Sequence, residues 1–443
     1  MTPPRTPNVA LRGLLGTCGW SGGRLAREVN RLGAEVGLGL RYERTSVAQW
    51  LRGSRPRDPV PELVVEAFAR RLGRRVTPEE AGFAQPPAPQ PPLPSAGPLA
   101  ALVTCDDPAA RCGYSLADLV ALPRRLSSPA SATDRAGPVL VRGSVRSLRA
   151  MTELFARNAY TIGSRPVRQP LVDYLAEAVA PDTDASARPE TRRQTMRAVA
   201  TLTRICGSVH YDDELHGVAQ RAYLTSADLA AGGGDREAVA KALRMLSMQA
   251  RWLGHYQVAT DLARTALEYG RDADGKQRAL LIGQLAAASA ANGEHEAARS
   301  GIREARRQIA EVARGSDAAV HLVRAHVDYY EALTHYHGGD APAAIRALRQ
   351  GVHTCPAGFP WPRSFMLART AELQVRRGQV EAACASWAAF LDESATLSSA
   401  TVDTAVRQLH GHLRPHGRHP AAAEVLRRAA LRSRLDLPWS AGT

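Results

Sequence analysis

The chain has 443 residues and a formal net charge of +14, which arginine supplies almost alone because Lys241 and Lys276 are the only lysines. This length predicts more than one domain, since a single domain usually has about 100 to 200 residues. The six cysteines lack CxxC pairs and dense spacing, and no apolar run is long enough to span a bilayer. These features argue against a disulfide-rich secreted scaffold and a membrane-spanning protein, and they predict a cytoplasmic one.

Four helical stretches are predicted in the first part of the chain. The first covers residues 8–15, and the second follows Ser21, a residue type that often caps helix starts. The fourth begins near Pro61, a favoured residue at a helix N-terminus, and ends at Gly73. Together with the third they predict a small N-terminal domain over residues 1–81.

The third stretch, RTSVAQWLRGSRP at 44–56, is the most informative of the four. Val47, Trp50 and Leu51 are spaced i, i+3 and i+4, which places them on one helical face and predicts that they are buried. Trp50 is therefore interpreted as a core anchor. The remaining face carries small polar residues, a glutamine and an arginine.

That polar face has the composition of a helix that enters the major groove of DNA. In such helices amides and hydroxyls meet base edges, while guanidinium groups hold phosphates. The sequence therefore predicts double-stranded DNA as a partner, with phosphate contacts from five arginines around the helix: Arg41, Arg44, Arg52, Arg55 and Arg57. An ordinary solvated face is the alternative for these arginines. Gln49 also has a structural alternative, because Ser46 and Gln49 show the S-x-x-Q spacing of a capping box.

Two segments resemble the phage-repressor-like (Cro/C1 or Xre) helix-turn-helix family. LARE at 25–28 resembles its first motif helix, and residues 47–56, with Trp50, Gly53 and Pro56, resemble the end of its recognition helix. The resemblance implies base contacts from the start of that helix, namely from Thr45, Ser46 and Gln49. The sequence departs from the family because RLGAEVGLGLRYER separates the two helices, where family members have a turn of a few residues.

A proline-rich segment follows the N-terminal domain. Residues 82–98, GFAQPPAPQPPLPSAGP, are nearly uncharged and show no helical or strand periodicity, which predicts an extended linker. Residues 99–197 are predicted to form a helical connecting region. Within it, residues 127–138 and 181–191 have the composition of loops.

Residues 198–443 contain an internal repeat. Five segments superpose without gaps, each with a glycine followed five places later by an alanine: Gly254 and Ala259, Gly293 and Ala298, Gly339 and Ala344, Gly378 and Ala383, Gly417 and Ala422. An earlier copy has Glu214 at the glycine position and Ala219 at the alanine position. Steps of about 40 residues with such small residues predict stacked helical hairpins, in which glycine permits the turn and alanine permits close helix contact.

Residues 252–256, which include Trp252, Leu253, Gly254 and Tyr256, resemble part of the tetratricopeptide consensus. The predicted fold class is therefore all-α: a small helix-turn-helix domain, a proline-rich linker and an α-solenoid of tetratricopeptide-like hairpins. This layout resembles a group of regulators from GC-rich, actinobacterial-type bacteria. HGVAQRAYL and RTSVAQWLRG are the segments that carry this resemblance.

Three functional hypotheses remain open from the sequence. The leading one is a sequence-specific DNA-binding transcriptional regulator, acting as a homodimer, whose repeats sense a peptide, a small molecule or a protein. The second is a protein-interaction scaffold with a basic N-terminal docking module. The third is an enzyme hidden in residues 99–213. We expect no enzyme, because the sequence shows no GxSxG, HExxH, phosphate loop or dinucleotide fingerprint.

No cofactor or metal is predicted. The histidine-rich segment LHGHLRPHGRHP brings together His410, His412, His416 and His419. A proline interrupts it, and no cysteine or carboxylate in the segment completes a ligand set. We therefore interpret these histidines as part of the last repeat's turn.

Overall fold

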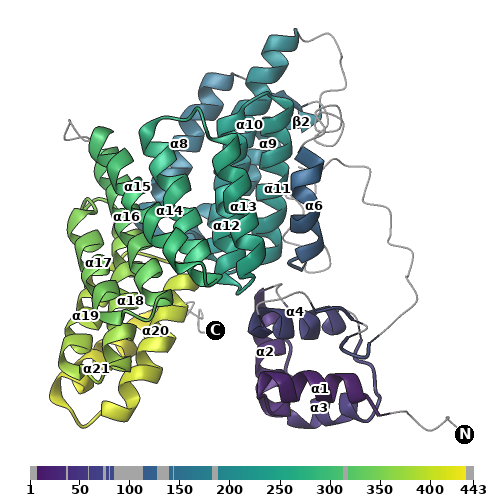
Figure 1. Cartoon of the computed structure of the whole chain (residues 1–443), viewed down its shortest axis with the longest axis vertical. Coiled ribbons are helices and arrows are strands. Elements are labelled where there is room, and N and C mark those ends of the chain that lie inside the picture. The colour runs from purple at the N-terminus through teal and green to yellow at the C-terminus, as the bar shows by residue number, and fades with distance from the viewer. Residues whose placement is uncertain are drawn as a thin grey trace, which may run out of the picture. The chain divides into compact units, whose positions relative to one another are not determined.

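The computed structural model describes residues 7–35, 38–57, 59–72, 76–78, 80–83, 113–126, 139–142, 144–181, 188–312 and 318–435. Over these residues the chain is almost wholly helical, which confirms the predicted fold class (Figure 1). The predicted linker lies outside the described residues from position 84 onward. In the described parts, no helix is both long enough and apolar enough to cross a membrane. The chain divides into two compact units, Met1–Ala150 with Leu171–Tyr269, and Met151–Pro170 with Gly270–Thr443.

The first unit begins with a four-helix domain around one hydrophobic core. Its helices are α1 (Val9–Cys18), α2 (Gly22–Glu35), α3 (Arg44–Leu51) and α4 (Val60–Leu72). The Asn8 side chain accepts a hydrogen bond from the backbone nitrogen of Leu11 at 2.8 Å and donates one to the carbonyl of Ala81 at 2.9 Å. Asn8 thus starts α1 and also ties the end of the domain to its beginning. Trp20 stacks on Phe68 of α4, with ring centroids 5.7 Å apart.

Two short strands interrupt the helical connecting region. After α6 (Leu116–Leu126), β1 (Val139–Val141) pairs antiparallel with β2 (Val179–Pro181), and Leu140 lies opposite Ala180. The intervening helices are α8 (Val145–Ile162) and α9 (Arg165–Ala178). The prediction of a helical connecting region over residues 99–197 misses this ladder, because three residues per strand are too few to show alternation.

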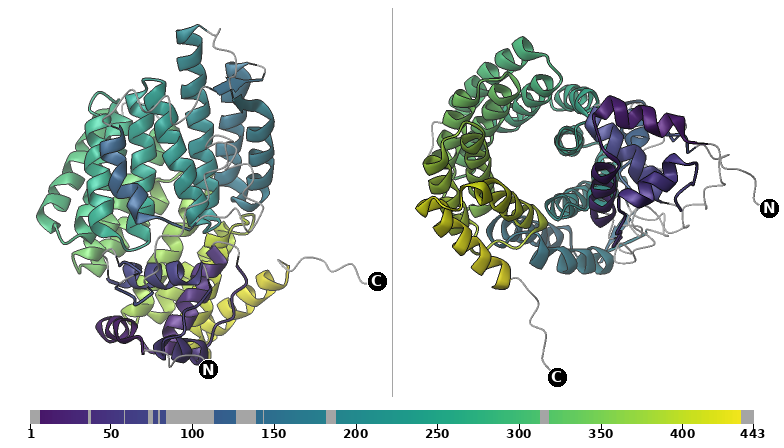
Figure 2. Two further views of the ribbon diagram at one scale, coloured as in Figure 1. Left: turned by 90° about the vertical axis from the view of Figure 1, so that its right-hand side faces the viewer. Right: turned by 90° about the horizontal axis from the view of Figure 1, so that it is seen from below.

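The repeats are antiparallel helical hairpins (Figure 1). In the first unit they are α10 (Pro189–Asp212) with α11 (His216–Gly232), and α12 (Arg236–Trp252) with α13 (Tyr256–Tyr269). In the second unit they are α14 (Gly275–Ala291) with α15 (His295–Val312), α16 (Ala318–His337) with α17 (Ala341–Thr354), α18 (Pro360–Arg376) with α19 (Val380–Glu393), and α20 (Ala400–Leu413) with α21 (Pro420–Leu435). The short 3-10 helix η1 (Arg414–His416) joins the last two. Figure 2 shows the helices of the second unit, green to yellow, as a row of neighbouring hairpins.

The structure confirms the roles predicted for the repeated glycine and alanine. Gly254, Gly293, Gly339 and Gly378 have φ values of 89°, 89°, 82° and 71°, which L-residues rarely adopt. Every repeated alanine is fully buried: Ala219, Ala259, Ala298, Ala344, Ala383 and Ala422 are each 0% exposed. Gly417 is the exception, with a φ of −62°, because η1 makes the last turn without a left-handed residue.

Glu214 occupies the same left-handed turn position in the first hairpin, with a φ of 58°. Because a side chain at such a φ costs roughly 1 to 2 kcal/mol, we expect Glu214→Gly to raise the free energy of unfolding by about 1 kcal/mol. Urea denaturation followed by circular dichroism measures this change. Glu214→Ala is the matched control, because it removes the same carboxylate and keeps the strain. Equal stability of the glycine and alanine variants would contradict the expectation.

Candidate functional site

The predicted DNA-contacting helix, α3, begins with a capping box formed by residues other than those the sequence suggested. The Glu43 side chain accepts a hydrogen bond from the backbone of Ser46, and the Ser46 hydroxyl accepts one from the backbone nitrogen of Glu43 at 3.4 Å. The alternative pairing of Ser46 with Gln49 is therefore wrong, because the helix starts three residues earlier than that pairing requires. Gln49 is exposed, and its side-chain amide forms no hydrogen bond with another described residue.

The buried face of α3 is the one predicted. Val47 is 0% and Trp50 is 4% exposed, and Trp50 meets Tyr42 edge to face with ring centroids 5.1 Å apart. Leu51 is only partly buried. The Asn30 side chain donates to the carbonyl of Tyr42 at 2.9 Å and accepts from its backbone nitrogen at 2.8 Å. Asn30 thus fixes the end of the long connection to α2. This gives α3 a defined orientation, even though the connection is longer than the turn found in the phage-repressor-like family.

The solvent-facing side of α3 carries two of the three residues predicted to contact bases. Thr45 and Gln49 are exposed and Ser46 is partly buried. The five arginines predicted to contact phosphates are all exposed: Arg41, Arg44, Arg52, Arg55 and Arg57. Four of them have no ion-pair partner among the described residues: Arg41, Arg44, Arg52 and Arg57.

Three arginines on α2 and α4, namely Arg24, Arg31 and Arg70, pair with carboxylates, whereas Arg12, Arg27 and Arg71 have no such partner among the described residues. Glu28 of α2 pairs with Arg24 at 3.2 Å and with Arg31 at 3.0 Å. Glu35 and Glu66 pair with Arg70. Most arginines around α3 therefore lack an ion pair in the described part of the chain, whereas Arg24, Arg31 and Arg70 on α2 and α4 have one.

A buried charged cluster joins α2, α4 and the turn between α12 and α13, all within the first unit. Arg70 donates to Glu35 at 2.8 Å through Nη1 and to Glu66 at 2.7 Å through Nε. Glu66 also lies 3.1 Å from Nε2 of His255, whose side chain is 1% exposed. The Tyr114 ring stacks on His255, with centroids 5.4 Å apart and planes 5° from parallel. This cluster was not predicted from the sequence.

The electrostatics of the cluster favour its charged pairs. Burial would raise the pKa of Glu66, but Arg70 and His255 outweigh it and hold that pKa below its usual value. Burial opposes the charge of Arg70, yet Glu35 and Glu66 raise its pKa. Burial, followed by the negative charge of Glu66, raises the pKa of Tyr114. Glu66 and Arg70 are therefore ionised at neutral pH, whereas Tyr114 is a neutral phenol.

Gly254 has a second role that its repeat position did not reveal. A Cβ atom on Gly254 would lie 2.6 Å from the carbonyl oxygen of Arg70, so a side chain there would collide with the end of α4. The spacing of Glu66 and Arg70, four residues apart on one helix, is the only local sequence signal for the cluster. It indicates an ion pair but not a partner 189 residues away.

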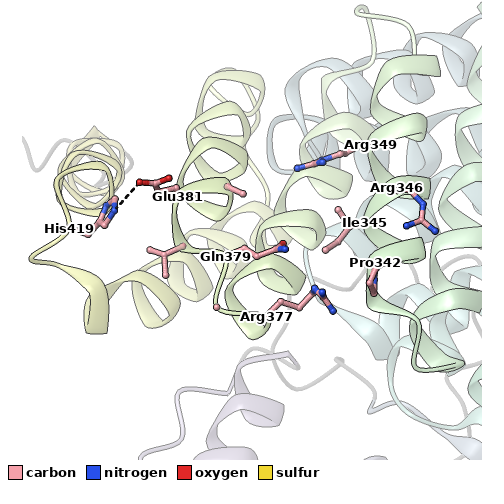
Figure 3. Close-up of a pocket in the computed structure, with 11 residues that line it drawn as sticks. Pro342, Ile345, Arg346, Arg349, Arg377, Gln379, Glu381 and His419 are labelled. Carbon is pink, nitrogen blue, oxygen red and sulfur yellow. Dashed lines mark ion pairs between the residues drawn. The ribbon is translucent and has the colours of Figure 1, made fainter.

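The second unit contains an arginine-lined groove of about 680 Å³. Figure 3 shows Arg346, Arg349 and Arg377 around the groove between α17 and the start of α19. Its apolar lining comes from Pro342, Ile345, Val380 and Ala382. At the far end, Nε2 of His419 lies 3.6 Å from Glu381. The groove offers an apolar floor with a surplus of positive charge.

The histidine-rich segment does not form a metal centre in the described structure. His419 pairs with Glu381 as described, and His412 faces Trp387 with ring centroids 6.2 Å apart. Throughout the described ranges, no three His, Cys, Asp or Glu side chains gather in a way that would hold a metal ion.

Comparison with known proteins gives a match to a family model and likenesses to solved structures. The family model is the SP15 N-terminal domain, and it matches residues 11–84. No curated protein matches the sequence. Among solved structures, a similar chain is that of "Crystal Structure of Rap Protein Complexed with Competence and Sporulation Factor", with a TM-score of 0.40, 10% identity, 66% of this chain covered and 99% of that chain. A likeness at this TM-score says nothing about function. Residues 11–84 are thus similar to the SP15 N-terminal domain, and the resemblance of α2 and α3 to phage repressors stays a prediction.

Proposed function

We propose that the protein is a DNA-binding regulator that places α3 in the major groove of a duplex. Thr45 and Gln49 contact base edges, and Ser46 adds a contact only from its partly buried position in the capping box. The five predicted arginines hold the phosphates on either side. The role of the chain is binding, not catalysis.

The observation that carries this proposal is the group of exposed arginines without ion pairs around α3. Carboxylates pair with Arg24, Arg31 and Arg70 on α2 and α4, whereas Arg41, Arg44, Arg52 and Arg57 around α3 have no such partner among the described residues. Unpaired arginines attract a polyanion without first breaking an ion pair. Gln49 lies among them with an amide that takes no part in the helix cap, and an amide of this kind can bond an adenine edge with both its atoms.

We also propose that the protein binds as a homodimer. DNA-binding proteins of this kind usually contact two half-sites, and the two-fold symmetry of the protein sets their spacing. The repeat array is the candidate for the dimer contact. A selected DNA site made of two related halves would support this part of the proposal.

Selection of bound fragments from a random duplex pool by the full chain, at two salt concentrations, tests the proposal. We expect an enriched motif that survives the higher salt. Thr45→Ala with Gln49→Ala should weaken binding to that motif by about 10- to 100-fold, because one bidentate base contact, which Gln49 can make and Thr45 cannot, contributes roughly 1 to 3 kcal/mol of discrimination. Binding to unrelated duplexes should change little.

Arg44→Ala with Arg52→Ala is the matched control on the same helix. It should weaken binding to all duplexes alike and lower the salt slope by about two. Ser46 is left intact in both variants because it caps α3. If no motif is enriched and all binding vanishes with salt, the regulator proposal is overturned.

A protein-interaction scaffold is the second candidate, and the groove in the second unit favours it. Three arginines around an apolar floor fit an acidic protein segment with an apolar residue, and no carboxylate other than Glu381 lines the groove. In this case the basic N-terminal domain is a docking module. If the duplex selection enriches no motif, the scaffold is the hypothesis that remains.

A further inference from the structure

Helix α6 lies on the repeat hairpins of the first unit in the manner of a bound ligand (Figure 1). Leu119, Leu122 and Leu126, spaced i, i+3 and i+7, are 1%, 0% and 5% exposed. On the other face Val120 is 60% exposed. One apolar stripe inward and an open opposite face are the pattern of an amphipathic helix seated in a groove.

Polar contacts hold both ends of α6. The buried amide of Gln220, on α11, accepts from the backbone nitrogen of Ser115 and donates to its carbonyl, both at 2.7 Å. Near the other end, Arg125 pairs with Asp228 of α11 at 3.0 Å. The Tyr269 hydroxyl of α13 donates to the carbonyl of Leu126 at 3.2 Å. Helix α11 thus contacts the backbone at the start of α6. At the end of α6, α11 contacts an arginine side chain and α13 contacts a backbone carbonyl.

The sequence on either side of α6 is suited to a tether. The proline-rich residues 82–98 precede it, and SSPASATDRAGP at 127–138 follows it. These compositions predict an extended linker before the helix and a loop after it. A tethered helix occupies its site because its effective concentration is high, and its own affinity need not be high.

We propose that the surface formed by α11 and α13 is a binding site for an amphipathic helix of a partner protein, and that α6 is its internal occupant. The partner helix carries leucines at i, i+3 and i+7 and an arginine directly before the last leucine, as α6 does. Gln220, Asp228 and Tyr269 are the selecting side chains. This inference is independent of DNA binding.

The same site is connected to the N-terminal domain. Tyr114 directly precedes the residue that Gln220 holds, and it stacks on His255, which contacts Glu66 of α4. When the partner helix displaces α6, Tyr114 leaves His255 and opens the charged cluster to water. Occupancy of the site on α11 and α13 therefore changes the contacts that the repeats make with α4 of the N-terminal domain.

The test uses the full chain and a fluorescein-labelled peptide of residues 113–127, GYSLADLVALPRRLS, with binding followed by anisotropy. Leu119→Asp with Leu122→Asp removes the internal competitor. This variant should bind the peptide at least about 30-fold more tightly than the unaltered chain does. Val120→Asp, on the exposed face of the same helix, should leave the affinity unchanged. Equal affinity of the unaltered chain and the double variant would overturn the proposal.

A charge exchange identifies the site. In the double variant, Asp228→Arg should weaken peptide binding about 10-fold, and a peptide with Arg125→Asp should regain most of it. Failure of this rescue, with circular dichroism showing an intact helical fold, would overturn the assignment to α11 and α13. A dimer of the unaltered chain that the double variant abolishes would assign the site to α6 of a second copy instead of a partner protein.

Hydrogen exchange of α4 tests the connection to the N-terminal domain. Protection of residues 60–72 should fall in the double variant and return when the peptide binds. A peptide with Tyr114→Ala should bind without restoring it. Unchanged protection in the double variant would overturn the connection and leave the helix site to be decided by the binding experiment.

Discussion

Arg70→Ala is expected to lower the free energy of unfolding of the first unit by about 3 to 5 kcal/mol. Arg70 is 10% exposed at its side chain, and its partners Glu35 and Glu66 are 7% and 13% exposed. Removing the guanidinium leaves two carboxylates in a place that excludes water. Glu35 then keeps only the half-exposed Arg31 and Glu66 keeps only His255, and the two carboxylates repel one another. Urea denaturation followed by circular dichroism, together with hydrogen exchange of α2 and α4, measures the loss.

Arg31→Ala is the matched control for this prediction. Arg31 pairs with the same Glu35, but its side chain is 52% exposed, so water screens the interaction. We expect a loss of less than about 1 kcal/mol. A second control combines Arg70→Met with Glu35→Gln and Glu66→Gln, which removes the isolated charges and should recover much of the stability. A loss below about 1 kcal/mol for Arg70→Ala would show that water reaches the cluster.

Acidification from pH 6.5 to pH 4 is expected to cost the first unit about 3 kcal/mol of stability through His216 alone. Burial lowers the pKa of His216 from 6.5 to about 4, with Arg70 and Arg31 reinforcing the shift and Glu35 opposing it. The unfolded chain therefore binds a proton near pH 6.5, whereas the folded chain does not until about pH 4. The stabilisation that depends on neutral His216 is largest above pH 6.5, decreases between pH 6.5 and about 4, and changes no further below that pH.

His216→Phe should remove this part of the pH dependence. The substitution keeps a ring for the edge contact with Tyr211, at 5.6 Å between centroids, and has no titrating nitrogen. Urea denaturation at several pH values from 7.5 to 4 compares the slope of stability against pH in the two proteins. His353→Gln, at an exposed position on α17, should leave the slope as it is. An unaltered slope in the His216→Phe variant would contradict the assignment.

The repeat fold was predictable because its requirements are local. A left-handed turn favours glycine, and two helices that pack closely favour alanine. The pattern of Gly254 and Ala259, a glycine followed five residues later by an alanine, therefore recurs in later hairpins. The buried face of α3 was predictable for the same reason, since Val47 and Trp50 follow helical periodicity. The helix start was not, because Glu43 is an unusual N-cap residue and Ser46 is a common one.

The charged cluster and the seat of α6 could not be predicted because their partners are remote in sequence. His255 and Glu66 are separated by 189 residues, and Ser115 and Gln220 by 105. No periodicity connects such pairs. Gln220 is a further difficulty, since a glutamine that binds backbone atoms places no demand on the side chain of its partner.

The double role of Gly254 limits how far the array is modular. A Cβ on Gly293, Gly339 or Gly378 would meet no neighbouring atom within 4 Å, whereas one on Gly254 would collide with the carbonyl of Arg70. Hairpins in a repeat protein can in principle be duplicated, deleted or exchanged without penalty beyond their own interfaces. The hairpin of α12 and α13 is different from those three, since moving it would displace the docking point of the N-terminal domain. Duplication of the hairpins that follow α13 is therefore compatible with the docking of the N-terminal domain. Duplication that moves the hairpin of α12 and α13 is not, because Gly254 contacts Arg70 there.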